Sequence, residues 1–292
     1  MSSLQAEIPA LPVADSGTSR RPKVTIRPAR GWELPDLSEL WSYRDLLWIL
    51  AGRDVKLRYK QTALGVIWVV LQPLLPALIF ALIFGRFAKL PSDGSSYLLF
   101  AYAGLVPWSY FSNGLVRAGN SLLADRNLIS KVYFPRLLIP VASTFAVLID
   151  LFVALAVLAA FMVVYRVMPD WHIVALPFFL LLATLATVGF SLWLSALNVR
   201  YRDFAYALPF VVQVWMFASP VAYATELVPG HIRWLYGLNP AVGFIEGFRW
   251  SLLGRSSISP EIVAAMTITS LLAFVSGILF FGCVERGFAD VV

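Results

Sequence analysis

Six apolar stretches of this sequence are each long enough to cross the hydrocarbon core of a membrane. A spanning helix needs about 20 predominantly apolar residues. The six stretches are approximately Thr62–Phe84, Tyr97–Val116, Leu137–Tyr165, Ile173–Leu197, Phe204–Ala224 and Ile262–Val284. Only 14% of the residues are charged, whereas soluble domains carry about 25%. The sequence therefore predicts an all-α integral membrane protein with six transmembrane helices within 62–284.

The segment between the fifth and sixth stretches is apolar but interrupted. Pro229-Gly230 and Asn239-Pro240 divide residues 227–254 into pieces that are each too short to span a membrane. Irregular backbone at membrane depth must be covered by protein, because lipid offers it no hydrogen bonds. We therefore expect two short re-entrant helices here, which dip into the membrane from one side.

Lys and Arg are distributed unevenly between alternate loops. Of the 23 Lys and Arg residues, 17 lie in the N-terminal region, the 117–136 loop, the 199–204 loop and the C-terminal tail 285–292. Cytoplasmic loops carry the excess of positive charge. We therefore expect both termini to be cytosolic and the 227–254 segment to be external. The net charge of +6 is interpreted as an orientation signal, with no nucleic acid as a partner.

The N-terminal region has two parts. Residues 1–37 are polar and basic, which predicts a flexible cytosolic tail. Residues 38–61 are predicted to form an amphipathic helix in the membrane interface, because Arg53, Lys56 and Lys60 share one helical face and aromatic residues follow another. An ordinary juxtamembrane cytosolic helix is the alternative interpretation.

The chain carries little of the chemistry that drives transport. Asp150 is essentially the one acid within the predicted spans. It has a structural role, as the partner of a cation from another helix or of a polar contact at a dimer interface, or it takes part in transport. The phosphate-binding pattern Gly-x-x-x-x-Gly-Lys-Ser/Thr is missing from the sequence. Cys283 and the two histidines lack partners at metal-ligand spacing. We expect no catalytic residue, no metal site and no bound cofactor, and ATP hydrolysis by a partner protein.

The 117–136 loop combines basic and apolar residues. A short amphipathic helix over Asn120–Lys131 could dock on a soluble subunit, and a solvated loop is the alternative. The candidate coupling residues in this loop are Asp125, Arg126, Asn127 and Lys131.

Aromatic and amide side chains occur in the kinked spans. Rings stack on the faces of sugars and amides hydrogen-bond to hydroxyls, so these residues could line a path for a glycan. Packing and interface anchoring are the alternative explanation for each of them. The candidates are Trp68, Gln72, Trp108, Gln213 and Trp215.

Several sequence blocks follow one another along most of the chain. In order, they are RDVKLRYKQTALGVIW (53–68) with LQP (71–73), NLISKVYFPR (127–136), NVRYRD (198–203), SP (219–220), LNP (238–240) with EGFR (246–249), and VERGFAD (284–290). Together these blocks resemble the membrane subunits of ABC exporters that carry O-antigen and teichoic-acid polysaccharides. The resemblance covers about 41–290.

The resemblance implies a homodimer of six-span subunits in a bacterial inner or plasma membrane. Two copies of a separate nucleotide-binding subunit would bind ATP and Mg²⁺, and a lipid-linked polysaccharide would be moved from the cytosolic to the outer side. On this interpretation residues 38–61 form a gate helix at the interface, and the 117–136 loop contains the coupling helix.

A lipid-linked substrate of this kind carries a pyrophosphate group. Arg53, Lys56, Arg58 and Lys60 are the candidate residues that meet this anion, because Arg binds phosphate bidentately and Lys acts as a point charge. The alternative is that these charges set topology and attract anionic lipid.

Two other functions remain open from the sequence. An exporter of small hydrophobic compounds would have the same architecture. A membrane glycosyltransferase would need paired acids on the outer side, and the acids there are scattered: Asp93, Asp170, Glu226, Glu246 and Glu261.

Overall fold

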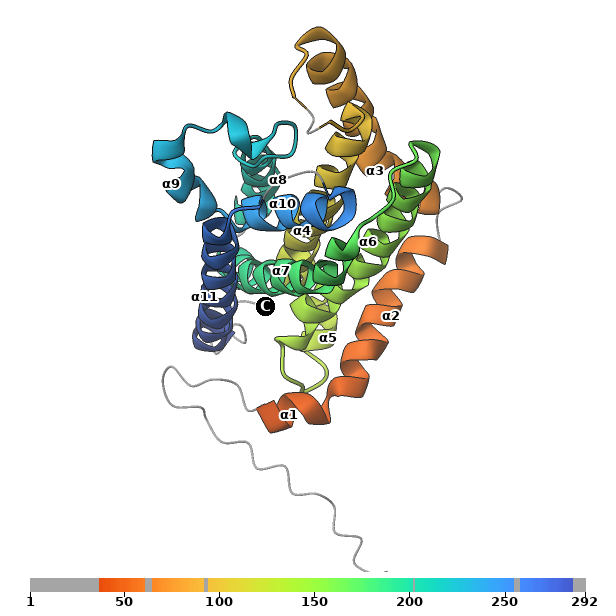
Figure 1. Cartoon of the computed structure of the whole chain (residues 1–292). Coiled ribbons are helices and arrows are strands. Elements are labelled where there is room, and N and C mark those ends of the chain that lie inside the picture. Colours follow the sequence, from red (N-terminus) through yellow and green to blue (C-terminus); the bar gives the residue numbers. More distant parts are fainter. Residues whose placement is uncertain (1–36, 61–64, 92–93, 202, 255–257, 286–292) are drawn as a thin grey trace, which may run out of the picture. The chain divides into compact units, whose positions relative to one another are not determined.

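The computed structural model describes residues 37–60, 65–91, 94–201, 203–254 and 258–285. These residues belong to one unit of the chain, Trp32–Val292. Every regular element in these ranges is a helix (Figure 1), which confirms the all-α prediction. Residues 1–36 of the predicted tail and residues 286–292 at the other end lie outside the described part of the chain.

Four helical segments in the described ranges are long and apolar enough to cross a membrane. They coincide closely with four of the six predicted spans. These segments are α3 with its π-helical continuation η1 (Gly65–Phe80 and Ala81–Phe87), α6 (Leu138–Val164), η2 with α7 (Trp171–Ala175 and Leu176–Arg200), and α11 (Pro260–Glu285).

The other two predicted spans correspond to α4 and α8. Helix α4 (Tyr97–Ala124) is long, but it carries polar residues along its second half. Helix α8 (Asp203–Phe217) has 15 residues, which rise about 22 Å against a hydrocarbon thickness of about 30 Å. The chain leaves the helix before Pro220, because proline lacks an N–H and restricts the residue before it. The helix is therefore shorter than the predicted Phe204–Ala224 segment.

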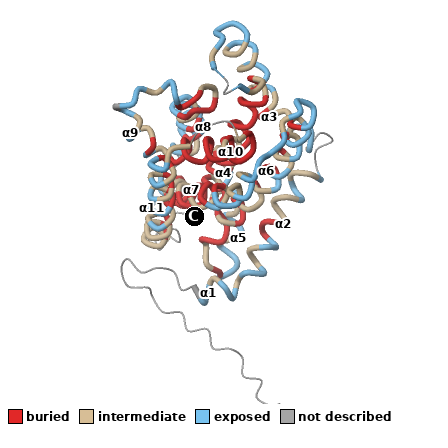
Figure 2. The backbone as a smooth tube through the Cα atoms, viewed as in Figure 1, coloured by how far each residue is buried: buried red, intermediate tan, exposed pale blue. Residues whose placement is uncertain are grey.

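Helix α4 forms the centre of the bundle. It packs against α3, α6, α7 and α8, and α7 packs in turn along α11. The buried residues concentrate in α4, in α7 and in the segment Pro240–Leu253, which is helix α10 (Figure 2). The N-terminal helices α1 (Leu37–Ser42) and α2 (Arg44–Lys60) follow one another, and α2 packs on α6.

The 227–254 segment contains two short α-helices, α9 (Arg233–Gly237) and α10 (Pro240–Leu253), after the 3-10 turns η3 (Thr225–Leu227) and η4 (Gly230–Ile232). Helix α10 begins where the Asn239 side chain accepts a hydrogen bond from Ala241 N, and it ends at Gly254, which has a φ of 66°. It packs against α4, α7 and α11, and almost all of its residues are buried.

A buried arginine fastens α10 to its neighbours. The Arg249 guanidinium group is fully buried and donates to Phe100 O (3.2 Å), Pro220 O (2.6 Å) and Val221 O (2.7 Å). It also pairs with Glu246 at 3.4 Å. Both charges lie in the segment expected to be external, and the structure shows that both side chains are buried in the protein.

The predicted amphipathic segment Asn120–Lys131 is not one separate helix. Its first five residues complete α4, and Leu122 is fully buried there. The chain turns at Asp125 and then forms the single-turn helix α5 (Arg126–Ile129). The apolar residues that suggested a docking face are thus divided between the core and the turn.

Helices α7 and α11 approach closely at two glycines. A Cβ atom on Gly189 would lie 2.4 Å from the Ala273 backbone, and one on Gly277 would lie 2.4 Å from Gly189 O. We predict that Gly189→Ala or Gly277→Ala lowers stability by about 1–3 kcal/mol, because the backbones must separate. Thermal unfolding in detergent measures the effect. Gly52→Ala is the matched control, since its Cβ would meet nothing within 4 Å; equal unfolding midpoints for all three variants would contradict the prediction.

Candidate functional site

Three basic residues of α2 line an open hollow of about 350 Å³. Lys56 and Lys60 follow Arg53 by three and seven residues, so the three side chains share a helical face. Ile49 and Leu57 complete the described part of its lining. We call these five residues the basic hollow. Lys56 and Lys60 are exposed and have no salt-bridge partner among the described residues. Cationic and apolar side chains together suit an anionic head group that carries a hydrocarbon chain.

Arg53 connects the basic hollow to the end of α4. Its Nη2 lies 2.5 Å from Asp125 Oδ2 and 2.9 Å from Asp54 Oδ1. The hydrogen bond to Asp125 is the main reason why the pKa of Arg53 is raised, and Asp54 adds to it against the effect of burial. Asp54 in turn accepts a hydrogen bond from Ser143 of α6 at 3.0 Å. The guanidinium group therefore joins two of the predicted sites, one on α2 and one in the 117–136 loop.

Arg58 lies on a different side of α2. Its guanidinium group pairs with Asp150 of α6, and the neighbouring Tyr59 hydroxyl donates to Asp150 Oδ1 at 2.6 Å. Burial, with a contribution from Arg117, lowers the pKa of Arg58 to about 10, so the group stays charged at neutral pH. Asp150 thus pairs with a cation from another helix, which is one of the roles expected for it. Arg58 is absent from the described lining of the basic hollow.

Asp150 also reaches a small internal cavity between α3, α4 and α6. The cavity measures about 10 Å³ and is lined in part by Gln72 and Asn113, which is close to the space that one water molecule needs. Asn113 Nδ2 donates to Gln72 Oε1 at 3.4 Å. One predicted glycan-path residue, Gln72, is therefore close to the ion pair that anchors α2.

The predicted coupling residues surround the turn between α4 and α5. We call residues Asp125–Lys131 the α4–α5 corner. Arg126, Asn127 and Lys131 are exposed, and only Asp125 is partly buried, through its bond to Arg53. Three charged or polar groups are therefore available to a partner, and the fourth is tied to α2.

The remaining glycan-path candidates do not meet within one chain. Trp68 on α3 is 57% exposed, and Gln213 on α8 is also exposed. Their helices pack on α4 but not closely on each other. Trp108 is buried, with its ring centroid 5.8 Å from that of Phe111. Trp108 therefore packs in the core, while Trp68 and Gln213 face outward from different helices.

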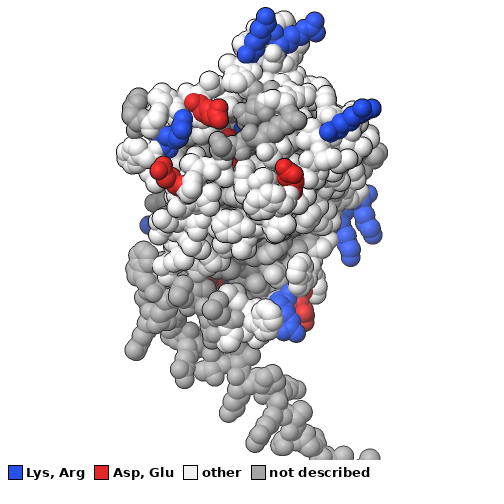
Figure 3. All heavy atoms as spheres, in the orientation of Figure 1, with Lys and Arg blue, Asp and Glu red and all other residues white. Residues whose placement is uncertain are grey.

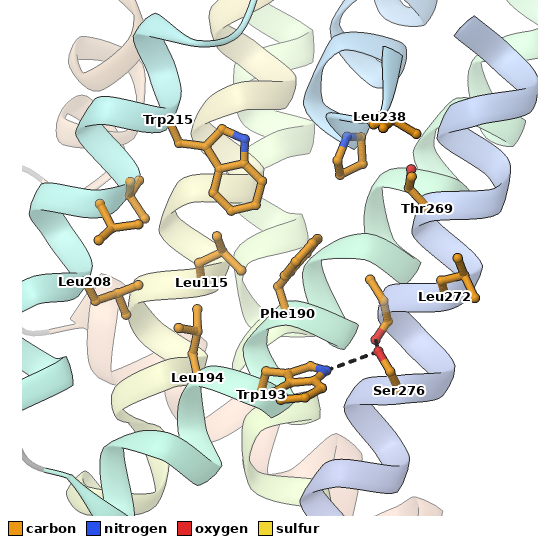
Figure 4. A pocket seen from close by; sticks show the side chains of 14 residues that line it. Leu115, Phe190, Trp193, Leu194, Leu208, Trp215, Leu238, Thr269, Leu272 and Ser276 are labelled. Carbon is orange, nitrogen blue, oxygen red and sulfur yellow. Dashed lines mark hydrogen bonds between the residues drawn. The ribbon is translucent and has the colours of Figure 1, made fainter. Parts of the chain in front are cut away.

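Trp215 lines an apolar cavity of about 520 Å³ between α4, α7, α8 and α11 (Figure 4). The indole N–H groups of its two tryptophans are hydrogen-bonded within the chain. Trp215 Nε1 donates to Asn239 Oδ1 at 2.9 Å, and Trp193 Nε1 donates to Ser276 Oγ at 3.2 Å. The cavity therefore presents mainly hydrocarbon and aromatic rings.

Asn239 is a functional candidate that the sequence analysis named only as part of a motif. Its side chain accepts hydrogen bonds from Trp215 and Ala241, and it donates to Ser219 Oγ at 3.0 Å. It thereby joins the end of α8 to the start of α10. The Asn-Pro pair was the available signal, because Asn is favoured before a helix and Pro at its first position.

The charged side chains are unevenly placed on the surface. In Figure 3 acidic and basic side chains are scattered over the upper half of the face shown, and further basic ones lie along its right-hand edge and near its lower end; a broad area below the centre shows almost no charged side chains. Exposed apolar residues on α3 and α8 include Leu78, Ile79 and Phe210. This distribution suits a protein whose middle lies in lipid.

The Asp150 ion pair gives a stability prediction. Asp150→Asn should cost about 2–3 kcal/mol, because it removes the carboxylate that balances the charge of Arg58 in a largely buried position. The cost is below that of a fully buried pair, since Arg58 keeps 18% of its side chain exposed. Thermal unfolding and protease cleavage within α2 measure the effect. Asp45→Asn on the same helix, where the side chain is 85% exposed, serves as the control. The double variant Arg58→Leu with Asp150→Leu should recover stability; a further loss would contradict this account.

The comparisons with known proteins cover nearly the whole described chain. The O-antigen export system permease protein RfbA of Klebsiella pneumoniae is 27% identical over 249 residues, which are 85% of this chain and 95% of that protein. The protein of the same name from Myxococcus xanthus is 27% identical over 257 residues, or 87% and 98% of the two chains. The capsule polysaccharide export inner-membrane protein CtrC of Neisseria meningitidis is 21% identical over 262 residues, or 86% and 95%. Residues 45–253 match the ABC-2 type transporter family, and the chain belongs to this family.

Proposed function

We propose that this chain is the membrane subunit of an ATP-driven exporter that moves a lipid-linked polysaccharide, of the O-antigen type or a related glycan, across the inner membrane. The observation that carries the proposal is the similarity to two O-antigen export permeases over 95% and 98% of their lengths. The capsule export protein is more distant, at 21% identity. The basic hollow on α2 suits the pyrophosphate of such a substrate.

The proposed topology has six spans and places the two termini in the cytosol. Helices α4 and α8 are counted as spans beside the four more apolar segments, and α9 with α10 are the external re-entrant pair. The division of Lys and Arg between alternate loops supports this orientation. Residues 38–61 then lie in the cytosolic interface, and 1–37 and 285–292 are cytosolic tails.

The proposed partners are a second copy of this chain and two copies of a separate ATPase subunit, which bind ATP and Mg²⁺. The exposed residues Arg126, Asn127 and Lys131 of the α4–α5 corner are the proposed contact with the ATPase. The outward positions of Trp68 on α3 and Gln213 on α8 support a glycan path between two copies of the chain. This chain itself would hold no cofactor and catalyse no reaction.

One alternative has a specific observation in its favour. The apolar cavity beside Trp215, of about 520 Å³, could hold a small hydrophobic compound, which is the cargo of the second candidate function. Such an exporter would not need a phosphate group on its substrate. A glycosyltransferase is less well supported, because Glu246, one of the acids that it would use, is already bonded to Arg249 and Thr225.

Binding of the ATPase can be tested at the α4–α5 corner. We predict that Arg126→Glu or Lys131→Glu lets the complex hydrolyse ATP but abolishes polysaccharide export, because reversing one exposed charge alters the contact that couples hydrolysis to transport and leaves the core intact. Surface polysaccharide and ATPase activity of the co-purified complex are measured together. Arg86→Glu, an exposed charge near the end of η1 and on the opposite side of the proposed topology, is the control. Export at the unaltered level in both corner variants would refute the assigned role.

The basic hollow can be tested separately from the ion pair of Arg58. Lys56→Gln and Lys60→Gln should each raise the concentration of lipid-linked substrate that half-stimulates ATPase activity by about fivefold, since each Lys near a membrane surface attracts anions. Arg44→Gln, at the other end of α2, should change it little. Stimulation by a small hydrophobic compound, and none by a pyrophosphate-linked lipid, would instead favour the alternative cargo.

A further inference from the structure

Arg53 lies between two acidic residues and two other basic residues. Its guanidinium group bonds the carboxylates of Asp54 and Asp125, at 2.9 and 2.5 Å. Its side chain also lines the basic hollow next to Lys56 and Lys60. It keeps 36% of its surface exposed, so a ligand in the hollow can reach it. One cation is therefore available both to the carboxylate of the α4–α5 corner and to an anion that enters the hollow.

We propose that a phosphate-bearing anion in the basic hollow competes with Asp125 for the Arg53 guanidinium group, so that occupancy of the hollow releases the α4–α5 corner. This inference rests on the proposed function, because it takes the hollow as the site of the substrate's pyrophosphate. It adds a regulatory link: the substrate site and the proposed ATPase contact share one side chain.

The competition follows from the donors and charges involved. A guanidinium group has five N–H donors in one plane and binds phosphate oxygens bidentately. A pyrophosphate brings more negative charge than one carboxylate, and Lys56 and Lys60 lie on the same helical face to attract it. The pair with Asp125 is partly exposed, with 36% and 19% of the two side chains accessible. Solvent therefore screens part of the attraction in this pair, so a dianion attracted by two lysines can compete with the carboxylate.

The Asp125 side chain tethers the corner but does not form it. The backbone of the turn is held by bonds of its own, from Asp125 N to Ser121 O at 3.0 Å and from Leu128 N to Asp125 O at 2.9 Å. Loss of the Arg53 bond therefore leaves the turn folded and frees it to shift relative to α2. Exposed Arg126 and Asn127 move with it, and these are the groups proposed to contact the ATPase.

Helix α2 does not need Asp125 in order to stay in place. Asp150 of α6 holds Arg58 and Tyr59, and Ser143 of α6 holds Asp54. The bond between Arg53 and Asp125 can break while α2 remains anchored. Because coupling between two sites is reciprocal, an ATPase that draws the corner away should also increase the affinity of the hollow for its anion.

The experiment uses the full chain in lipid nanodiscs, with Cys283→Ser to remove the native thiol. Asn127→Cys carries an environment-sensitive fluorophore that reports on the corner. Polyprenyl pyrophosphate is titrated as the probe, and the matching polyprenol, which lacks the anion, is the ligand control. Binding affinity and the fluorophore signal are recorded for each variant, and unfolding midpoints verify that the variants are folded.

The expected results differ between the two acids that bond Arg53. The parent protein should bind the pyrophosphate, and the signal should shift. Asp125→Asn should bind it about fivefold more tightly, since the competitor is gone, and its signal should be shifted before any ligand is added. Asp54→Asn is the matched control: it relieves the same guanidinium group of a carboxylate, but its signal should start at the parent level and still respond to ligand.

Two outcomes would overturn the inference in distinguishable ways. If the parent protein prefers the pyrophosphate to the polyprenol, but Asp125→Asn shows unchanged or weaker affinity or an unshifted starting signal, the bond is only structural. The proposed function then stands and the link does not. If the parent protein binds the two lipids equally, or binds neither, the basic hollow is not a pyrophosphate site, and the proposed role of the hollow fails together with the inference.

Discussion

A charge inside an apolar protein must find a partner, and this constraint determines how the helices of the chain are joined. Desolvation of a lone ionised group costs far more than a folded protein can tolerate. Arg249 meets the constraint with backbone carbonyls of α4 and of the turn after α8, and with Glu246. Arg58 and Asp150 meet it by joining α2 to α6. Each pairing fixes two elements that are far apart in the sequence.

Polar groups of several sequence blocks that suggested a polysaccharide exporter bond one another in the structure. Ser219 of one block and Asn239 of the next bond each other, and Pro220 O accepts from Arg249. Arg136, which ends another block, donates through its backbone N to Glu285 Oε1 at 3.1 Å. The blocks therefore act in pairs as junctions between helices. A block that serves a junction need not touch substrate, so the motifs identify the fold more directly than they identify the transport path.

The sequence predicted the elements well and the partnerships poorly. Apolar periodicity is a local property, so the helices and their approximate ends could be predicted, apart from α8, which ends before Pro220, and α4, which continues through Leu122. The candidate cations were placed on one helix correctly, but Arg53 and Arg58 are five residues apart and thus about 140° apart around it. Which of these two side chains meets an acid depends on the helix that packs against its face of α2. The local sequence does not contain that information.

The division of cations on α2 explains how one helix can be both anchored and responsive. The face with Arg58 is held by Asp150, which prevents α2 from sliding, while the face with Arg53, Lys56 and Lys60 stays open. A ligand on the open face then acts by exchanging the partners of one side chain, without moving α2. The helix of the α4–α5 corner has four residues and no buried side chain, so little packing resists a shift there. Because one face of α2 is anchored, a change of partner at Arg53 alters the position of the α4–α5 corner and not the position of α2.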